Sequence, residues 1–137
     1  ASHRLRRKKI LRPEDFEGED FISIGRDNPF RYLIDRAFVD AGVKRHIVVE
    51  ATHVATAAAL VAEGAGITVL DPYTAVSSMR RDDVVLRPFQ PEIKFEVKLL
   101  SPANHPVPLI VEEFLHHLDT EHSAMKKLIG ELVSNGR

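Results

Sequence analysis

The sequence predicts an α/β domain with a mostly parallel sheet, built on a β-α-β-α-β segment from Phe21 to Leu70. Three observations support this prediction. A β-branched apolar run, Ile47 to Val49, is typical of a buried parallel strand. Apolar residues at helical spacing come before and after that run. A second apolar run, Ile67 to Leu70, follows a pair of glycines. Right-handed crossovers would then place the strands side by side in parallel.

The residues before Ile47 predict the first strand and the first helix. Phe21 to Ile24 is a short apolar run of strand type. Asn28 is a good N-cap residue, and Pro29 suits the first helical position. Apolar side chains then recur on one face until Gly42 ends the helix. Two pairs of opposite charge at i,i+4 spacing are expected on the outer faces of this helix: Arg31 with Asp35, and Arg36 with Asp40.

The second helix and third strand are predicted from residues 52 to 72. Thr52 is the expected N-cap, and apolar residues recur at helical spacing from Val54 to Val61. Gly64 and Gly66 permit positive φ where the helix ends and the chain turns back. The strand Ile67 to Leu70 then stops at the Asp71-Pro72 pair.

Three further elements are expected before the proline-rich connector of residues 102–108. Tyr73 to Met79 predicts a short helix. Val84 to Arg87 predicts a strand that Pro88 closes. From Ile93 to Leu99, apolar residues alternate with charged ones, which is typical of an antiparallel or edge strand with one solvated face.

The two ends of the chain have distinct compositions. Residues 1–12 contain six basic side chains and no acidic one, and are expected to form a solvated lead-in or connector. A phosphate-contacting arm is the alternative. Pro13 to Phe16 predicts one helical turn anchored by Phe16. Leu109 to Leu118 predicts an amphipathic C-terminal helix, which could continue to Val133 with or without a break near Thr120.

Composition narrows the class of protein. The chain has 137 residues, of which 44% are hydrophobic and 28% are charged, as in a globular domain with its own core. There is no cysteine, which fits a reducing cytoplasm, and no apolar run approaches the roughly 20 residues of a membrane helix. The net charge of −1 does not indicate nucleic-acid binding by the whole molecule.

The predicted binding surface lies where strands end and helices begin. Ligands of open parallel sheets bind at this edge, because helix N-termini there offer free N–H groups and a favourable dipole to anions. Two helix starts follow predicted strands, and a third strand ends before Tyr73. The alternative is that Asn28 and Thr52 only cap helices. The candidate ligand-binding residues are Gly25, Arg26, Asp27, Asn28, Thr52, His53 and Tyr73.

Other kinds of site have little support. The Gly64–Gly66 segment precedes a strand, whereas a dinucleotide-binding motif follows a strand and opens a helix. Acidic and histidine side chains crowd residues 112–122, but neighbouring pairs do not make a zinc site, and a solvated helix face is the favoured interpretation. No catalytic constellation is visible. We therefore expect no metal, no cofactor and no enzyme activity.

Several segments together resemble the effector-binding domain of LysR-type transcriptional regulators over roughly residues 3 to 118. They are the turn Glu14 to Gly18, the helix through Ala41-Gly42-Val43, the strand ending at Glu50, the segment Leu60 to Ile67, and Leu86-Arg87-Pro88-Phe89. The segment from Val61 to Ile67 is the most diagnostic part.

The resemblance implies a lobe of the type 2 periplasmic-binding-protein fold that binds a small effector, expected to be a carboxylate such as an amino acid. It divides the chain into a lead-in (1–12), an effector-binding lobe (13–108), and a C-terminal helix and tail (109–137). By the same resemblance, the residues of this sequence correspond to the second lobe and the closing helix of the family domain. DNA would then be contacted only through a helix-turn-helix domain that is absent from this chain. We expect a homo-oligomer, a dimer or larger. The alternative function is a protein or nucleic-acid interaction module using the basic arm and the C-terminal helix.

Overall fold

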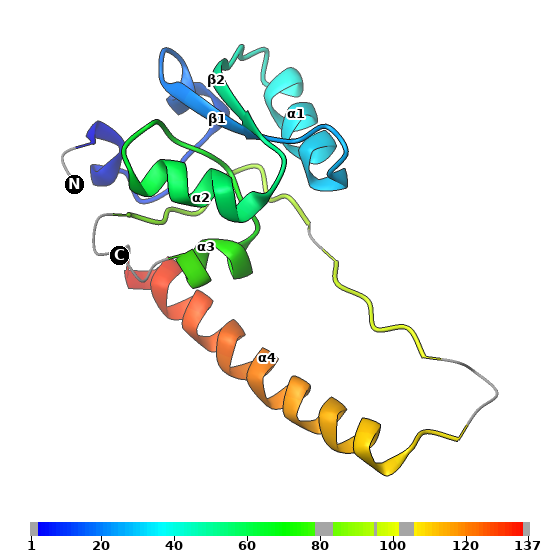
Figure 1. Cartoon of the computed structure of the whole chain (residues 1–137). Helices are drawn as coiled ribbons and strands as arrows, with labels where there is room; N and C mark the ends of the chain where they lie inside the picture. Colours follow the sequence, from blue (N-terminus) through cyan, green and yellow to red (C-terminus); the bar gives the residue numbers. More distant parts are fainter. Residues whose placement is uncertain (1–2, 79–83, 95, 102–105, 136–137) are drawn as a thin grey trace.

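A parallel pair of strands, flanked by two helices, forms the centre of the molecule (Figure 1). The computed structural model describes residues 3–78, 84–94, 96–101 and 106–135. Two 3-10 turns and six longer elements follow one another along the chain: η1 (Arg4–Arg7), η2 (Pro13–Phe16), β1 (Asp20–Ile24), α1 (Pro29–Asp40), β2 (His46–Ala51), α2 (Val54–Ala62), α3 (Pro72–Ser78) and α4 (Leu109–Asn135).

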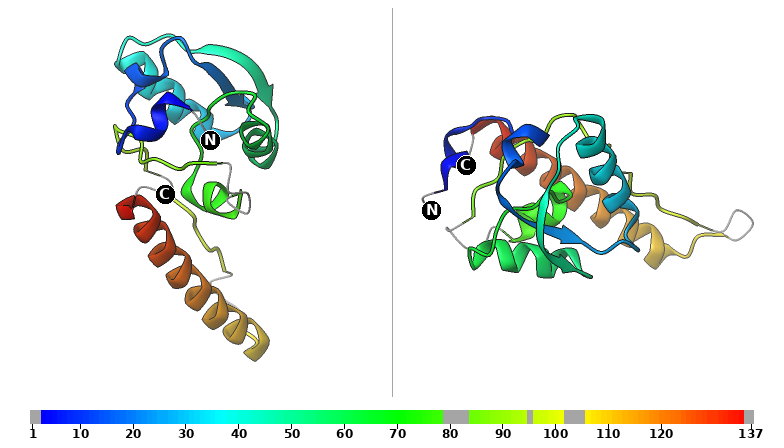
Figure 2. Two further views of the ribbon diagram at one scale, coloured as in Figure 1. Left: turned by 90° about the vertical axis from the view of Figure 1, so that its left-hand side faces the viewer. Right: turned by 90° about the horizontal axis from the view of Figure 1, so that it is seen from above.

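The sheet has the predicted parallel topology. β1 and β2 run parallel, with Asp20 opposite His46 and Ile24 opposite Ala51. Ile67 forms a parallel bridge to Phe21 on the other side of β1, so β1 is central. Because α1 connects β1 to β2 and α2 returns the chain past β1, the two helices lie on opposite sides of the sheet (Figure 2).

Aromatic residues form the core between β1 and α1. Phe16, Phe21 and Phe38 are fully buried, and their rings meet edge to face at centroid distances of 5.3 to 5.9 Å. Phe89 stacks on Phe38 at 5.7 Å, which brings the residue 84–93 segment onto the core. The guanidinium of Arg45 covers both the Phe21 and Phe38 rings, at 5.0 and 4.7 Å. The predicted anchoring role of Phe16 is confirmed.

Of the three later strands that the sequence predicts, the first is present only as a single parallel bridge beside β1, and the other two are not formed in the part of the chain that the structure describes. The run Ile67 to Leu70 pairs only at Ile67, and Val84 to Arg87 has no strand assignment. The expected antiparallel strand at 93–99 is absent from its described residues, and Phe95 lies outside them. Alternating hydrophobicity specifies a strand only where a partner edge is available.

The C-terminal helix is one uninterrupted element of 27 residues, so no break occurs near Thr120. The Thr120 hydroxyl donates to the His116 carbonyl at 2.9 Å, within the helix. α4 contacts α3, where the Tyr73 hydroxyl and His122 Nε2 are 2.8 Å apart, and its N-terminal half extends away from the lobe (Figure 1). The predicted helix Tyr73 to Met79 is confirmed as α3, although Met79 lies outside the described residues.

The basic N-terminal segment is mostly exposed, as expected of a lead-in or connector, but it is anchored on the lobe at Leu5. Leu5 is buried, Arg4 pairs with Glu19, and Lys8 pairs with Asp15. Leu11 exchanges backbone hydrogen bonds of 2.8 Å with the segment around Phe89. The composition of this segment shows its positive charge, but it does not show that folding brings Glu19 and Asp15 next to it.

Candidate ligand-binding site

The ends of β1 and β2 meet, which places the two loops after them in contact. Gly25 donates its backbone N–H to the Ala51 carbonyl at 2.8 Å. A Cβ atom at Gly25 would lie 3.4 Å from Thr52 Cα, at ordinary van der Waals distance. We call the surface formed by Gly25–Asn28 and Thr52–His53 the rim. Two sequence segments that are separated by a whole helix therefore form one surface.

The first half of the rim begins α1 as predicted. Asn28 is the N-cap, and its side-chain oxygen accepts from the Phe30 N–H at 2.9 Å. Pro29 occupies the first helical position. Arg26 and Asp27 are exposed on the loop before this cap, while Gly25 is buried beneath them. The Asn28 side chain is thus committed to capping, and the two charged side chains remain at the surface.

The second half of the rim begins α2 without a side-chain cap. The N-cap is His53 and not Thr52, so the predicted capping role of Thr52 is wrong. The helix starts one residue later because β2 continues to Ala51, and the His53 carbonyl accepts from the Thr56 and Ala57 N–H groups. Within the described residues, no side chain accepts from the first N–H groups of α2. Thr52 and His53 are both exposed there.

A chain of ion pairs lies directly beneath the rim. Arg31 is 6% exposed and donates to the Ile24 carbonyl at 2.6 Å and to Glu50 Oε2 at 3.2 Å. It also donates to Asp35 Oδ1 at 2.7 Å. Burial lowers the pKa of Arg31, but the hydrogen bonds that Arg31 donates to Asp35 and Glu50 outweigh this and raise its pKa overall. Arg26 Nε lies 3.7 Å from Glu50 Oε2, so Glu50 links the buried arginine to an exposed one.

The buried role of Arg31 was not predicted from the sequence. Arg31 was assigned to the outer face of α1 because Asp35 follows at i,i+4 spacing, and that pair is present. The signal that could have corrected the assignment is Glu50, an acidic residue at the end of an otherwise apolar strand. Arg31 pairs with this carboxylate at 3.2 Å.

Tyr73 does not join the rim through any hydrogen bond that the structure records. Its ring lies at the start of α3, and its hydroxyl is paired with His122 of α4. The two rings are 5.8 Å apart. The structure therefore brings together six of the seven predicted site residues and directs the hydroxyl of the seventh to the C-terminal helix.

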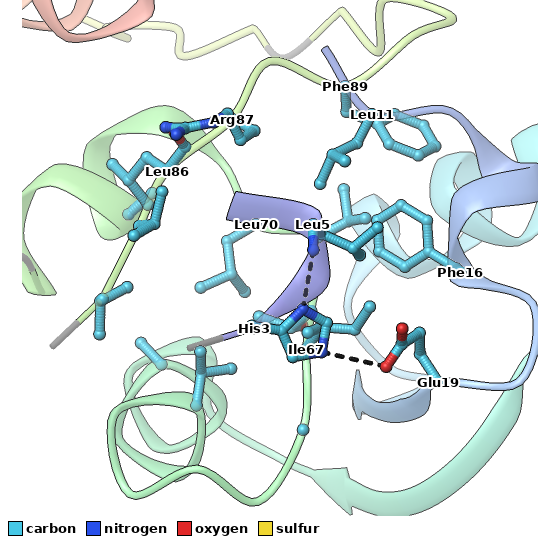
Figure 3. Close-up of a pocket in the computed structure, with 18 of the residues that line it drawn as sticks. His3, Leu5, Leu11, Phe16, Glu19, Ile67, Leu70, Leu86, Arg87 and Phe89 are labelled. Carbon is cyan, nitrogen blue, oxygen red and sulfur yellow. Dashed lines mark hydrogen bonds and ion pairs between the residues drawn. The ribbon is translucent and has the colours of Figure 1, made fainter. Parts of the chain in front are cut away.

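A hollow of about 950 Å³ lies elsewhere in the molecule, between α2, α3, the N-terminal segment and residues 84–93. Its lining is mainly apolar, with Leu5, Leu70 and Leu86 facing one another across it (Figure 3). None of the rim residues lines it. The rim and this hollow are separate features.

Comparison with known proteins agrees with this architecture. A family model described as the LysR substrate binding domain matches residues 1–123. The chain belongs to the LysR substrate-binding domain family. It is 36% identical over 130 residues to the transcriptional activator protein LysR of Escherichia coli K12, covering 95% of this chain and 40% of that protein. It is 30% identical over 112 residues to the regulatory protein NocR of Agrobacterium tumefaciens T37, covering 82% of this chain and 37% of that protein.

Family membership establishes the broad class of this LysR-type domain. It is a ligand-binding domain of transcriptional regulators and not an enzyme, and the family implies a periplasmic-binding-protein-like fold. The chain spans about 40% of the length of the curated relatives it matches. None of the helices that the structure describes is long and apolar enough to cross a membrane.

Proposed function

We propose that this LysR-type domain senses a small carboxylate effector, such as an amino acid, at the rim formed by Gly25–Asn28 and Thr52–His53. The observation that carries the proposal is the contact between the two strand ends beside an uncapped helix. A carboxylate at the start of α2 would accept from backbone N–H groups and benefit from the helix dipole. The Thr52 hydroxyl and the His53 ring are exposed at the same place and can donate to it.

The charges around the rim favour a ligand that carries both signs. Arg26 can pair with a carboxylate, while Asp27 is an exposed carboxylate on the same loop. Glu50 adds a second acid within 3.7 Å of Arg26. A purely anionic ligand would meet these acids, whereas the ammonium group of an amino acid would be stabilised by them. Tyr73 would contribute only if its hydroxyl exchanged His122 for the ligand.

The proposed regulatory role is that of a sensor within a longer cytoplasmic regulator. Its relatives are named as a transcriptional activator and a regulatory protein. The interaction-module alternative for the basic arm has weaker support, because Leu5 is buried and both Arg4 and Lys8 have carboxylate partners on the lobe.

Calorimetric titration with a panel of amino acids and small monocarboxylates tests the proposal. We expect at least one amino acid to bind, and its affinity to fall about tenfold in both Thr52→Ala and Arg26→Ala, which corresponds to about 1.4 kcal/mol each. The matched controls are Thr120→Ala and Arg36→Ala, exposed helical residues far from the rim. Binding that is unaffected by both rim variants would refute the assignment of the site.

A further inference from the structure

The carboxylate of Asp27 lies over the contact between the two loops of the rim. It is exposed, and within the residues that the structure describes it has no recorded hydrogen bond or ion pair. Gly25 defines its position, because a Cβ atom added to Gly25 would lie 2.6 Å from Asp27 Oδ1 and 3.4 Å from Thr52 Cα. An acid without a recorded partner is therefore held beside the start of the second loop.

Glu50, the other acid near the rim, is committed to two arginines. Its Oε2 atom lies 3.2 Å from Arg31 Nη1 and 3.7 Å from Arg26 Nε. Arg31 is only 6% exposed and is fixed to the Ile24 carbonyl at 2.6 Å. An ammonium group that approached Glu50 would have to compete with a buried guanidinium, and displacing such a partner is costly.

Glu50 belongs to a row of side chains whose charges alternate. In order they are Arg45, Asp35, Arg31, Glu50 and Arg26, and each contacts the next. The side chains of Arg45 and Arg31 are 9% and 7% exposed, whereas that of Arg26 is 83% exposed. The row begins and ends with a cation, and only its Arg26 end faces solvent. A ligand carboxylate on Arg26 would continue the alternation.

Glu50 contacts Arg26 at an atom that leaves the rest of the guanidinium open. The contact is to Nε, and the described part of the chain shows no other recorded contact for Arg26. The Nη1 and Nη2 groups are therefore available as the planar fork that matches a carboxylate. Both rim side chains reach the end of β2: Arg26 meets Glu50, and Asp27 lies beside Thr52. A cation and an anion of the rim are thus presented together.

We propose that Asp27 is the residue that accepts the ammonium group of the effector, while Arg26, oriented by Glu50, pairs with its carboxylate. This inference rests on the function proposed above and deepens it. The rim selects amino acids over carboxylic acids that have the same carbon skeleton but no amino group. Gly25 takes part in this selection, because a side chain at that position would displace the Asp27 carboxylate.

Calorimetric titration with two matched ligands tests the role of Asp27. The probes are the standard amino acid that binds best and the acid that lacks only its amino group, for example glutamate and glutarate. We expect the unsubstituted chain to bind the amino acid about fivefold more tightly than its analogue, and Asp27→Asn to remove this preference. Asp40→Asn is the matched control, because Asp40 is an exposed carboxylate of α1 paired with Arg36, and it should keep the preference.

Gly25→Ala tests the same role without changing Asp27. The added methyl group would meet the flexible end of the Asp27 side chain, which can swing away, and would remain at ordinary distance from Thr52 Cα. We therefore expect a folded protein, verified by circular dichroism, that has lost the preference for the amino acid. Gly130→Ala is the control, because a Cβ atom there meets nothing within 4 Å. A Gly25→Ala variant that keeps the preference would overturn the proposal.

The ratio of the two affinities separates ligand recognition from a structural role. Asp27 precedes the N-cap of α1, where a carboxylate also interacts favourably with the helix dipole. If Asp27 acted only on the helix, Asp27→Asn would lower stability and leave the ratio unchanged. An unchanged ratio would therefore overturn the proposal.

Glu50→Gln separates the orienting acid from the recognising one. Glutamine keeps an acceptor for Arg31 but loses the charge that holds Arg26. We expect the affinities of the amino acid and its analogue to fall by a similar factor of about three to five, with the preference retained. Weaker binding of the amino acid alone would make Glu50 the ammonium acceptor, and tighter binding of the analogue would show that Glu50 only repels carboxylates. Either result would contradict the proposal.

The proposed function and this inference fail in different ways. If neither ligand bound, or if Arg26→Ala left both affinities unchanged, the function proposed for the rim would be refuted together with the inference. If the amino acid bound and Arg26→Ala weakened its binding, but Asp27→Asn left the preference intact, only the assignment of the ammonium acceptor would be overturned.

Discussion

Arg31 donates to Glu50 over 3.2 Å and so joins α1 to β2 directly beneath the rim. The same guanidinium holds the Ile24 carbonyl at the end of β1, one residue before Gly25. One buried side chain thus fixes both strand ends whose loops form the candidate site.

Arg31→Ala should therefore destabilise the fold by about 2–4 kcal/mol, since it leaves buried or half-buried oxygen atoms without a donor. Arg31→Lys should recover little of this, because one ammonium group cannot reproduce three directed hydrogen bonds. Urea denaturation measures the free energy of unfolding of both variants. Arg36→Ala, which removes an exposed i,i+4 pair, should change stability by less than about 0.5 kcal/mol.

Asp35 should make the fold sensitive to acid. Burial raises the pKa of Asp35, but hydrogen bonds from Arg45 and Arg31 outweigh burial and hold the pKa below its usual value of 3.8. A carboxyl with a depressed folded-state pKa stabilises the fold above its unfolded-state pKa, and this contribution is lost as the pH falls through the folded-state value. Stability measured between pH 6 and pH 3 should decline less steeply in Asp35→Asn than in the unsubstituted chain. If stability declined equally steeply with pH in both proteins, the stabilising role of the hydrogen bonds from Arg45 and Arg31 to Asp35 would be contradicted.

Gly66 should be far less replaceable than Gly64. A Cβ at Gly66 would lie 2.4 Å from the Asp20 carbonyl oxygen, a backbone atom that cannot move away, and φ is +151°. At Gly64 φ is +80°, but the space around the Cβ position is open. We expect Gly64→Ala to lower the free energy of unfolding by about 1 kcal/mol and Gly66→Ala to lower it by more than about 2 kcal/mol. Thermal denaturation measures both. Similar costs would show that backbone conformation alone matters at this turn.

The contact between Tyr73 and His122 should govern the position of α4 more than the stability of the lobe. Tyr73→Phe removes one exposed hydrogen bond and should lower global stability by less than about 1 kcal/mol. Amide hydrogen exchange in the C-terminal half of α4 should nevertheless accelerate, because this helix has few other contacts with the lobe. Unchanged exchange in α4 would mean that other contacts hold the helix.

Local signals made the centre of the fold predictable. Asn28 and Pro29 define the start of α1 through capping and a fixed φ, and the β-branched run at Ile47 defines β2. Parallel pairing then followed from chain order. The strand predicted at Ile93 failed for the opposite reason, since alternation is local whereas a ladder needs a partner edge.

The rim was only partly predictable. Strand ends and helix starts placed Gly25 and Thr52 on one edge, but the one-residue shift of the α2 N-cap to His53 depends on how far β2 pairs with β1. Arg31 was assigned to the surface because a helical sequence does not show which face the end of a neighbouring strand covers. Tyr73 was assigned by chain order, and its actual partner, His122, is 49 residues away.

Amide chemical shifts during titration with the amino acid that binds best would test the rim most directly. We expect the largest perturbations to fall on Gly25, Thr52, His53 and the first uncapped N–H groups of α2, and Thr52→Ala to need about ten times more ligand to reach the same perturbation. Perturbations centred on Leu5, Leu70 and Phe89 around the hollow, with the rim unchanged, would contradict this expectation.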